Sequence, residues 1–214
     1  MSDSVTTLAI KAVSAKCAAT FKSQGFRRRS PHLYREASDV FHCIHFQASQ
    51  WGSRESGRFT VNLGITSASI YRHWTGRPLP ANPATALWPI QQRIGAVCGE
   101  PRDLWWDVSS DSDVPALAAD ICQRIQNSGL PFFSRYPSTD AILDEVQRGI
   151  TLFGMSTSQM ALLHAMLLVD IGRLDDAAAC IQEALLSNKV ELFRGTILLI
   201  ARRLKLPTLG AGEP

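Results

Sequence analysis

The residues with the most evident capacity for chemistry are polar side chains that alternate along two adjacent segments. Arg58, Thr60 and Asn62 occupy every second position of one segment, and His45 and Gln47 do so in the segment before it. Side chains at alternate positions of a strand point to the same face of a sheet. The pattern therefore predicts a polar sheet face that carries guanidinium, hydroxyl, imidazole and amide groups.

Such a face suits recognition. We expect Arg93 and Trp106 to lie near it. Arginine, amide and aromatic groups bind a ligand or a protein chain through hydrogen bonds and packing. In the alternative interpretation, a helix or water covers the face and its polar groups satisfy one another.

A second group of candidate residues is basic. The formal net charge is only +3, but the N-terminal quarter is rich in Lys and Arg. A basic patch with aromatic neighbours could hold a nucleic acid through phosphate contacts and stacking. The same residues would also suit the rim of a protein interface, or a solvated face. The patch consists of Arg27, Arg28, Arg29 and Arg35.

No catalytic or cofactor motif is recognisable in the sequence. It has neither a Gly-x-Ser-x-Gly nucleophile elbow nor a Gly-x-x-x-x-Gly-Lys phosphate loop. His42 and His45 stand three apart on a predicted strand, so their rings point to opposite faces and do not easily share a metal. His32 and His73 would add ligands only through contacts made by the fold. We therefore expect no catalytic residue, no metal site and no cofactor.

Length and composition indicate a globular cytoplasmic protein. The 214 residues are 45% hydrophobic and 19% charged, which suits one packed domain with or without an appendage. No apolar run is long enough to span a bilayer, and the N-terminus does not resemble a signal peptide, so we expect no membrane partner. The five cysteines are widely spaced and lack Cys-x-x-Cys, which favours reduced thiols in a cytoplasm.

The candidate residues need a sheet to position them. Strict alternation of apolar and polar residues predicts a strand over residues 58–65 with one buried face. We predict further strands over 32–36, 40–51 and 104–108, and a helix over 4–24 that packs on one face of the sheet. The predicted fold class is α+β, with an antiparallel sheet of about four strands.

The chain changes character after the sheet. We assign residues 1–135 to the α+β domain. Helical patterns fill residues 138–206, which form a C-terminal helical extension, and residues 207–214 are expected to be a tail.

An ordered series of motifs runs through the first part of the chain. They are Gly25-Phe26-Arg27-Arg28-Arg29, Tyr34-Arg35-Glu36, Gln47-Ala48-Ser49, Gly57-Arg58-Phe59-Thr60-Val61-Asn62-Leu63-Gly64, Arg93-Ile94-Gly95, Leu104-Trp105-Trp106 and Leu130-Pro131-Phe132-Phe133. This series resembles the bacterial family called domain of unknown function 4304, over roughly residues 4–135. The resemblance implies an α+β domain and no particular activity, and residues 138–206 fall outside it.

The helical extension also contains a weaker resemblance. Residues 161–186 are similar to one tetratricopeptide helix pair, with Gly172 at the turn. Stacked arrays need several such units, so a two-helix hairpin packed on the domain is the favoured interpretation.

These observations favour a non-enzymatic, cytoplasmic protein-binding module. An inhibitor or immunity protein for a toxin would suit a small chain without a catalytic signature. The alternative is a nucleic-acid-binding or nucleic-acid-processing protein that uses the basic N-terminal patch. A third possibility, a small-molecule enzyme, requires His45 and Arg58 to line one pocket.

Overall fold

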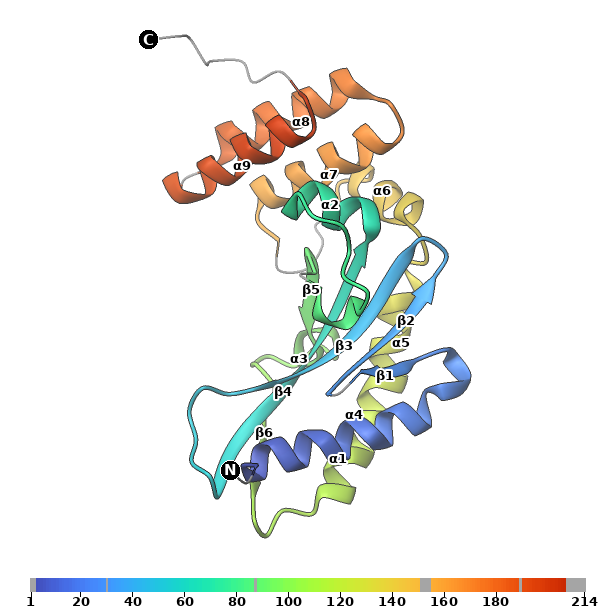
Figure 1. Cartoon of the computed structure of the whole chain (residues 1–214), viewed down its shortest axis with the longest axis vertical. Coiled ribbons are helices and arrows are strands. Elements are labelled where there is room, and N and C mark those ends of the chain that lie inside the picture. The colour runs from blue at the N-terminus through green and yellow to red at the C-terminus, as the bar shows by residue number, and fades with distance from the viewer. Residues whose placement is uncertain (1–2, 30, 87, 151–154, 189, 207–214) are drawn as a thin grey trace.

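The structure, a computed structural model, describes residues 3–29, 31–86, 88–150, 155–188 and 190–206. It combines one antiparallel sheet with an N-terminal helix and several C-terminal helices, which confirms the α+β class (Figure 1). The sheet lies between α1 and α4 at one end of the molecule and α7, α8 and α9 at the other (Figure 1).

The sheet is built around its longest strand, β4. The strand order is β1-β2-β3-β4-β5, and β6 pairs with β4 beside β5, which makes six strands where about four were predicted. β5 pairs with the second half of β4 and β6 with the first half. The strands are β1 (Arg27–Arg29), β2 (His32–Ala37), β3 (Val40–Ala48), β4 (Ser56–Ser67), β5 (Ile90–Arg93) and β6 (Trp106–Ser109).

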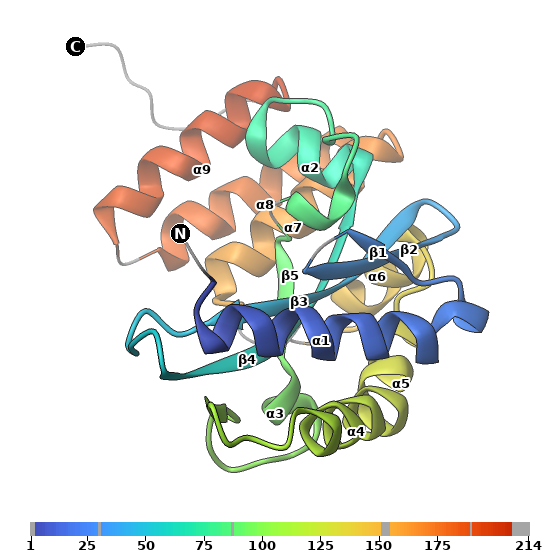
Figure 2. The same cartoon turned by 60° about the horizontal axis from the view of Figure 1, so that its bottom comes forward.

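One face of the sheet is apolar and covered by helices. Alternate residues of β4 point into it and are completely buried, as the sequence predicted. Helices α1 (Val5–Thr20) and α4 (Val114–Arg124) pack side by side beneath this face (Figure 2). The buried residues of β4 on this face are Phe59, Val61, Leu63 and Ile65.

Helix α1 begins and ends where its sequence specifies. The Ser4 hydroxyl accepts a hydrogen bond from the Thr7 backbone N–H and so caps the first turn. The final turn is a 3₁₀ helix over Lys22–Gln24, and Gly25 then adopts a left-handed conformation with φ 85°. The predicted helix over 4–24 is therefore confirmed, with a tighter final turn.

Helix α4 continues through a π-helical turn, η3 (Ile125–Gly129), into α5 (Leu130–Ser134). Pro131 lacks a backbone N–H and its ring crowds the preceding turn, which accounts for the wider turn. The α5 segment places Phe132 and Phe133 in the core.

The opposite face of the sheet is covered only in part. After α2 (Ala68–Thr75) the chain runs back through the short turn η2 (Pro83–Thr85) and lays the Trp88 ring over Gly64. A Cβ at Gly64 would stand 2.5 Å from that ring, so glycine is required there. The loop thus closes one half of the face and leaves the half nearer β6 open.

The C-terminal helices pack against α2. His73 in α2 forms a 2.8 Å contact with Asp170 in α7, and the Arg203 guanidinium donates to the Trp74 carbonyl. The short helix α3 (Ile94–Val97) lies between β5 and β6. The helices that follow α5 are α6 (Thr139–Gln147), α7 (Thr157–Asp170), α8 (Leu174–Ser187) and α9 (Glu191–Arg203).

Helices α7 and α8 form the expected hairpin, and Ser156 with Gln159 makes a reciprocal capping box at its start. The predicted tail, residues 207–214, lies outside the described residues. Among the described helices, none has the length and apolar character needed to cross a membrane.

Candidate functional site

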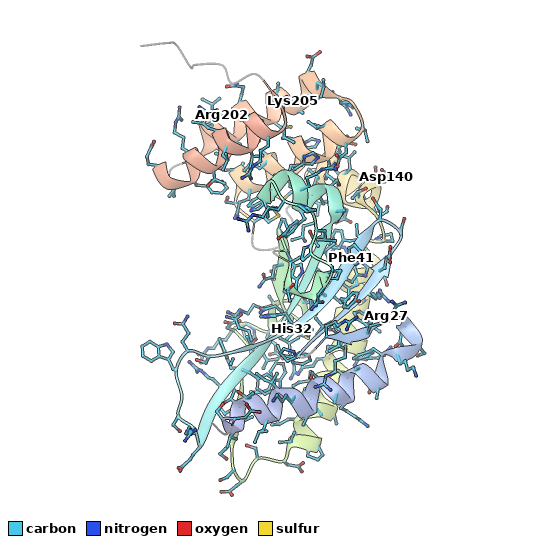
Figure 3. All side chains as sticks on the ribbon, viewed as in Figure 1. Arg27, His32, Phe41, Asp140, Arg202 and Lys205 are labelled. Carbon is cyan, nitrogen blue, oxygen red and sulfur yellow. The ribbon has the colours of Figure 1, made fainter. Side chains whose placement is uncertain are left out.

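A row of polar residues crosses five strands in register on the partly open face. Arg29 pairs with His32, His45 pairs with Asn62, and Asn62 pairs with Arg93. The pairing of β2 with β3 brings His32 opposite His45. We call Arg29, His32, His45, Asn62 and Arg93 the cross-strand row. Figure 3 marks His32 within it.

The two histidines at the centre of the row are neutral. Their ring centroids lie 4.1 Å apart, and Trp88 meets His45 edge-on at 5.3 Å. Burial lowers the pKa of His32 to about 4, with a further contribution from His45. Burial also lowers the pKa of His45. At neutral pH both rings therefore serve as hydrogen-bonding groups without charge.

Asn62 on β4 contacts two residues of β3, His45 and Gln47. Its side chain is completely buried, and its Nδ2 donates to Gln47 Oε1 at 2.8 Å and contacts His45 Nδ1 at 3.3 Å. Because the amide nitrogen only donates, His45 Nδ1 accepts and the ring proton resides on Nε2. The predicted association of His45, Gln47 and Asn62 on one face is therefore present.

The row holds polar atoms that lack partners. His32 Nδ1, Asn62 Oδ1 and Arg93 Nη1 are buried and have no hydrogen-bond partner, and they make up half of the six such side-chain atoms among the described residues. Buried polar groups are nearly always hydrogen-bonded, and an unpaired one costs about 1–3 kcal/mol. Three of these six atoms lie in one row, so this face has the largest group of unsatisfied buried polar atoms in the described part of the chain.

Arg58 and Trp105 adjoin the row at its β5 end, where Arg93 lies. The guanidinium carbons of Arg58 and Arg93 lie 5.1 and 4.9 Å from the centre of the Trp105 ring. Asp103 accepts a hydrogen bond from the Trp105 indole at 3.2 Å and lies 3.5 Å from Arg93 Nε. Cation–π contacts and this carboxylate hold the two guanidinium groups in place.

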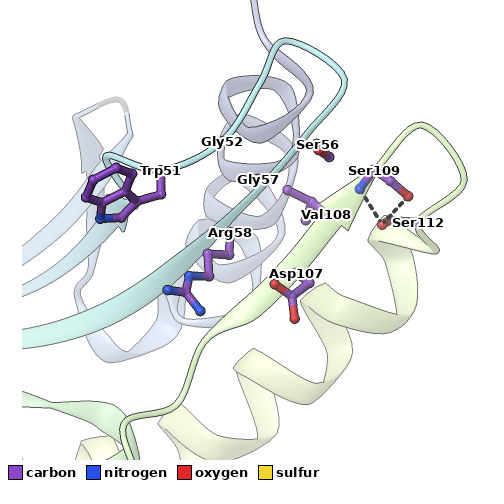
Figure 4. A pocket seen from close by; sticks show the side chains of 9 residues that line it. All are labelled: Trp51, Gly52, Ser56, Gly57, Arg58, Asp107, Val108, Ser109 and Ser112. Carbon is purple, nitrogen blue, oxygen red and sulfur yellow. Dashed lines mark hydrogen bonds between the residues drawn. The ribbon is translucent and has the colours of Figure 1, made fainter.

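Beyond Arg58 the face opens into a shallow hollow of about 520 Å³, between the loop that follows β3 and strand β6 (Figure 4). Trp51 stands at its rim with 79% of its surface exposed, and Asp107 lies opposite Arg58 in the strand register. The hollow includes Arg58 but not His45, so these two residues do not line this pocket together, as a small-molecule enzyme would require.

Two predicted site residues are buried, and one of them lies on the other face. Trp106 pairs with Phe59, so it shares the apolar face, where its ring stacks on Phe59 and its indole N–H donates to Asp120 at 2.8 Å. Thr60 points to the polar face but is buried, and its hydroxyl donates to the Leu104 carbonyl at 2.8 Å. Neither side chain is available to a ligand.

The predicted basic patch is divided between the two faces. Arg28 faces α1, where it donates to the Ser14 hydroxyl and the Lys11 carbonyl. Arg35 faces the same side and lies over the Phe26 ring at 4.9 Å, and burial lowers its pKa. Only Arg27 and Arg29 are on the polar face, so the four arginines do not form one surface.

His42 and His45 point to opposite faces, as predicted. His42 is buried on the apolar face, where its Nδ1 accepts from Arg35 Nε at 3.1 Å and its Nε2 donates to the Tyr136 carbonyl at 2.7 Å. Burial lowers its pKa to about 4. Within the described ranges, no group of three or more His, Cys, Asp and Glu side chains could hold a metal ion.

Comparison with known proteins gives a family assignment. Residues 17–135 match the family described as Domain of unknown function (DUF4304), which is more than half of the chain. The chain belongs to this family. The cross-strand row, Trp105 and the hollow all lie in the DUF4304 segment, whereas α6 to α9 follow it. No curated protein and no solved structure matches the chain.

Sequence reasoning did not assign Trp105 to the candidate site, and it placed His32 and Arg29 in other groups. Trp105 could have been found by testing both registers of the segment 104–108, because a shift of one residue exchanges Trp105 with Trp106. No signal in the sequence identifies the pairing of His32 with His45, since this contact depends on the turn between β2 and β3.

Proposed function

We propose that this protein is a non-enzymatic binding module whose polar sheet face holds an acidic segment of a protein partner. The observation that carries the proposal is the cross-strand row, which has an arginine at each end and three buried polar atoms without partners. A partner that supplies carboxylates would pair with Arg29, which is exposed, and with Arg93, which is half-buried.

The residue types around the row support a protein interface. Trp and Arg are enriched among the residues that dominate binding energies at such interfaces. Trp105 with Arg58 and Arg93 forms one preorganised group, and Trp51 projects from the loop beyond it. Preorganised side chains lose less conformational entropy on binding, which favours affinity.

The charge of the face favours an acidic partner. Arg27, Arg29, Arg58 and Arg93 all lie on it, and the carboxylates on or beside it include Glu36, Asp103 and Asp107. An excess of positive charge attracts acidic segments and speeds their association. An inhibitor or immunity protein is one role that a module of this kind would serve.

The nucleic-acid alternative is less well supported by the same residues. Two guanidinium groups already occupy the Trp105 ring, which limits its use as a stacking platform for a base. Arg28 and Arg35, half of the predicted basic patch, are engaged with α1 and with Phe26.

The test is affinity capture of the tagged full chain from its own cells, with a pair of charge-matched variants. Arg58→Ala/Arg93→Ala removes the arginines of the site, and Arg194→Ala/Arg202→Ala removes two exposed arginines from α9 (Figure 3 marks Arg202). We expect the first variant to bind a purified partner at least about 30-fold more weakly, because hot-spot residues contribute about 2 kcal/mol or more. The α9 variant should bind normally.

Circular dichroism and urea unfolding should show that both variants stay folded. Unchanged affinity of a folded Arg58→Ala/Arg93→Ala protein would refute the assignment of this face. Co-purifying nucleic acid, with binding that nuclease abolishes and that falls steeply with salt, would instead support the alternative.

A further inference from the structure

Two cysteine thiols from distant parts of the chain touch beneath the apolar face. Cys17 on α1 and Cys122 on α4 are 105 residues apart in sequence, and their Sγ atoms lie 3.3 Å apart. A disulfide bond has an S–S length of about 2.05 Å, so the sulfurs need to approach by only about 1.2 Å. α1 and α4 pack directly against each other, which holds the pair together.

The two thiols have different surroundings. Cys17 is completely buried, whereas Cys122 keeps 8% of its surface exposed. The Cys17 thiol hydrogen-bonds to Cys122, which lowers the pKa of Cys122, and the nearby Lys16 charge lowers it further. The same hydrogen bond and burial raise the pKa of Cys17. Cys122 is therefore the more readily ionised and the more accessible of the two.

The other three cysteines lack this arrangement. Cys43 lies near the Pro83 carbonyl, and burial raises its pKa. Cys180 lies 3.4 Å from His164 Nδ1 and also has a raised pKa, chiefly through burial. Cys98 is partly exposed. The only close contact between two sulfur atoms in the described part of the chain is the one between α1 and α4.

We propose that Cys17 and Cys122 form a peroxide-sensitive dithiol, an oxidative modification site that covalently links α1 to α4. The Cys122 thiolate attacks one oxygen of hydrogen peroxide, the O–O bond breaks, and the departing hydroxide takes up a proton to leave as water. Cys122 becomes a sulfenic acid.

The neighbouring Cys17 then completes the reaction. Its sulfur attacks the Cys122 sulfur, the S–S bond forms and the S–O bond breaks. The leaving hydroxide takes the Cys17 proton and departs as a second water. Two thiols are oxidised by two electrons in total, and one peroxide is reduced to two waters. The site lies on the helix-covered side of the sheet, so the proposal is independent of the binding face.

The test is to treat the reduced full chain with hydrogen peroxide, block the remaining thiols and map the tryptic peptides by mass spectrometry. Trypsin separates every cysteine: Cys17 falls in peptide 17–22 and Cys122 in 103–124. We expect these two peptides to be joined, with the loss of two hydrogen atoms, and the oxidised protein to unfold at higher urea concentration than the reduced one.

Variants sharpen the result. Cys98→Ser should form the same link, because Cys98 is not part of the pair. Cys17→Ser should leave Cys122 as a sulfenic acid that a dimedone-type probe captures, since no second thiol resolves it. The wild-type peptide map does not depend on how the variants fold. A link between other cysteines, or oxidation of Cys122 beyond sulfenic acid without a link in the wild type, would overturn the proposal.

Discussion

Two adjacent tryptophans show how differently the two faces of the sheet are used. Trp106 lies on the apolar face, is 6% exposed, stacks on Phe59 and donates to Asp120. Trp105 lies on the polar face, half-buried, with two guanidinium groups against its ring. The same residue type thus contributes to the core at one position and to a candidate binding surface at the next.

The two faces differ in how completely their polar groups are satisfied. The apolar face buries complete side chains and satisfies its polar groups, as His42 does through Arg35 and Tyr136. The polar face leaves His32, Asn62 and Arg93 with unpaired atoms. Four predictions test this division, in decreasing order of expected effect.

Trp106→Ala should destabilise the protein by about 3–5 kcal/mol, because it removes a large buried ring and leaves a cavity. Trp105→Ala should cost about 1 kcal/mol or less, since that ring is half-exposed. Urea unfolding of both variants measures the contrast. Equal losses would show that the two faces do not differ in their contribution to stability.

Gly64→Ala should cost about 1–3 kcal/mol through overpacking. Its Cβ would stand 2.5–2.7 Å from Trp88 ring atoms, on the covered half of the polar face. The matched control is Gly195→Ala in α9, where a Cβ meets nothing within 4 Å. That change should stabilise the helix by about 0.5–1 kcal/mol, and a stabilising effect of Gly64→Ala in thermal unfolding would argue that Trp88 does not cover the face.

Acidification should weaken the fold through His42. Its pKa is lowered to about 4 in the folded protein, against about 6.5 when unfolded, so below pH 6.5 the unfolded state binds more protons. Stability should fall by on the order of 2 kcal/mol from pH 6.5 to pH 4 and change little from this group at lower pH.

The measurement is urea unfolding from pH 7 to pH 4. His42→Gln should be less stable at pH 7 but show a flatter pH dependence than the wild type. His45→Gln, on the other face, should flatten it less. If His42→Gln retains the full pH dependence, burial of His42 is not its source.

Arg28→Ala should cost about 1 kcal/mol, because it removes hydrogen bonds to Ser14 and Lys11 on α1. Arg29→Ala should change stability by about 0.5 kcal/mol or less, since Arg29 is exposed on the polar face. Thermal unfolding at one pH compares the two. A larger effect of Arg29→Ala would mean that the exposed end of the row contributes to the fold.

Much of this division could be predicted from the sequence. Alternation along residues 58–65 assigned the buried and polar sides of β4 correctly, and spacing alone placed His42 and His45 on opposite faces. The capping residues Ser4 and Ser156 and the left-handed Gly25 also follow from local chemistry. These features depend on residues that are close together in the chain, so the local sequence is enough to predict them.

Strands β1 and β5 could not be predicted in this way. Arg27–Arg29 is a run of three like charges, and Ile90–Arg93 has only four residues, so neither shows a strand pattern. Each becomes a strand because a neighbouring strand supplies its hydrogen bonds. The candidate site depends on both, since Arg29 and Arg93 form the two ends of the row.

The sequence by itself determined which residues share a face of each strand, because side chains alternate with a period of two. Only the tertiary structure decided how the strands align with one another. A shift of one residue between β4 and β6 would exchange Trp105 with Trp106 and move the buried ring to the open face. The β4–β6 register depends on packing between segments about fifty residues apart. The cross-strand row depends on the alignment of five strands, β1 to β5.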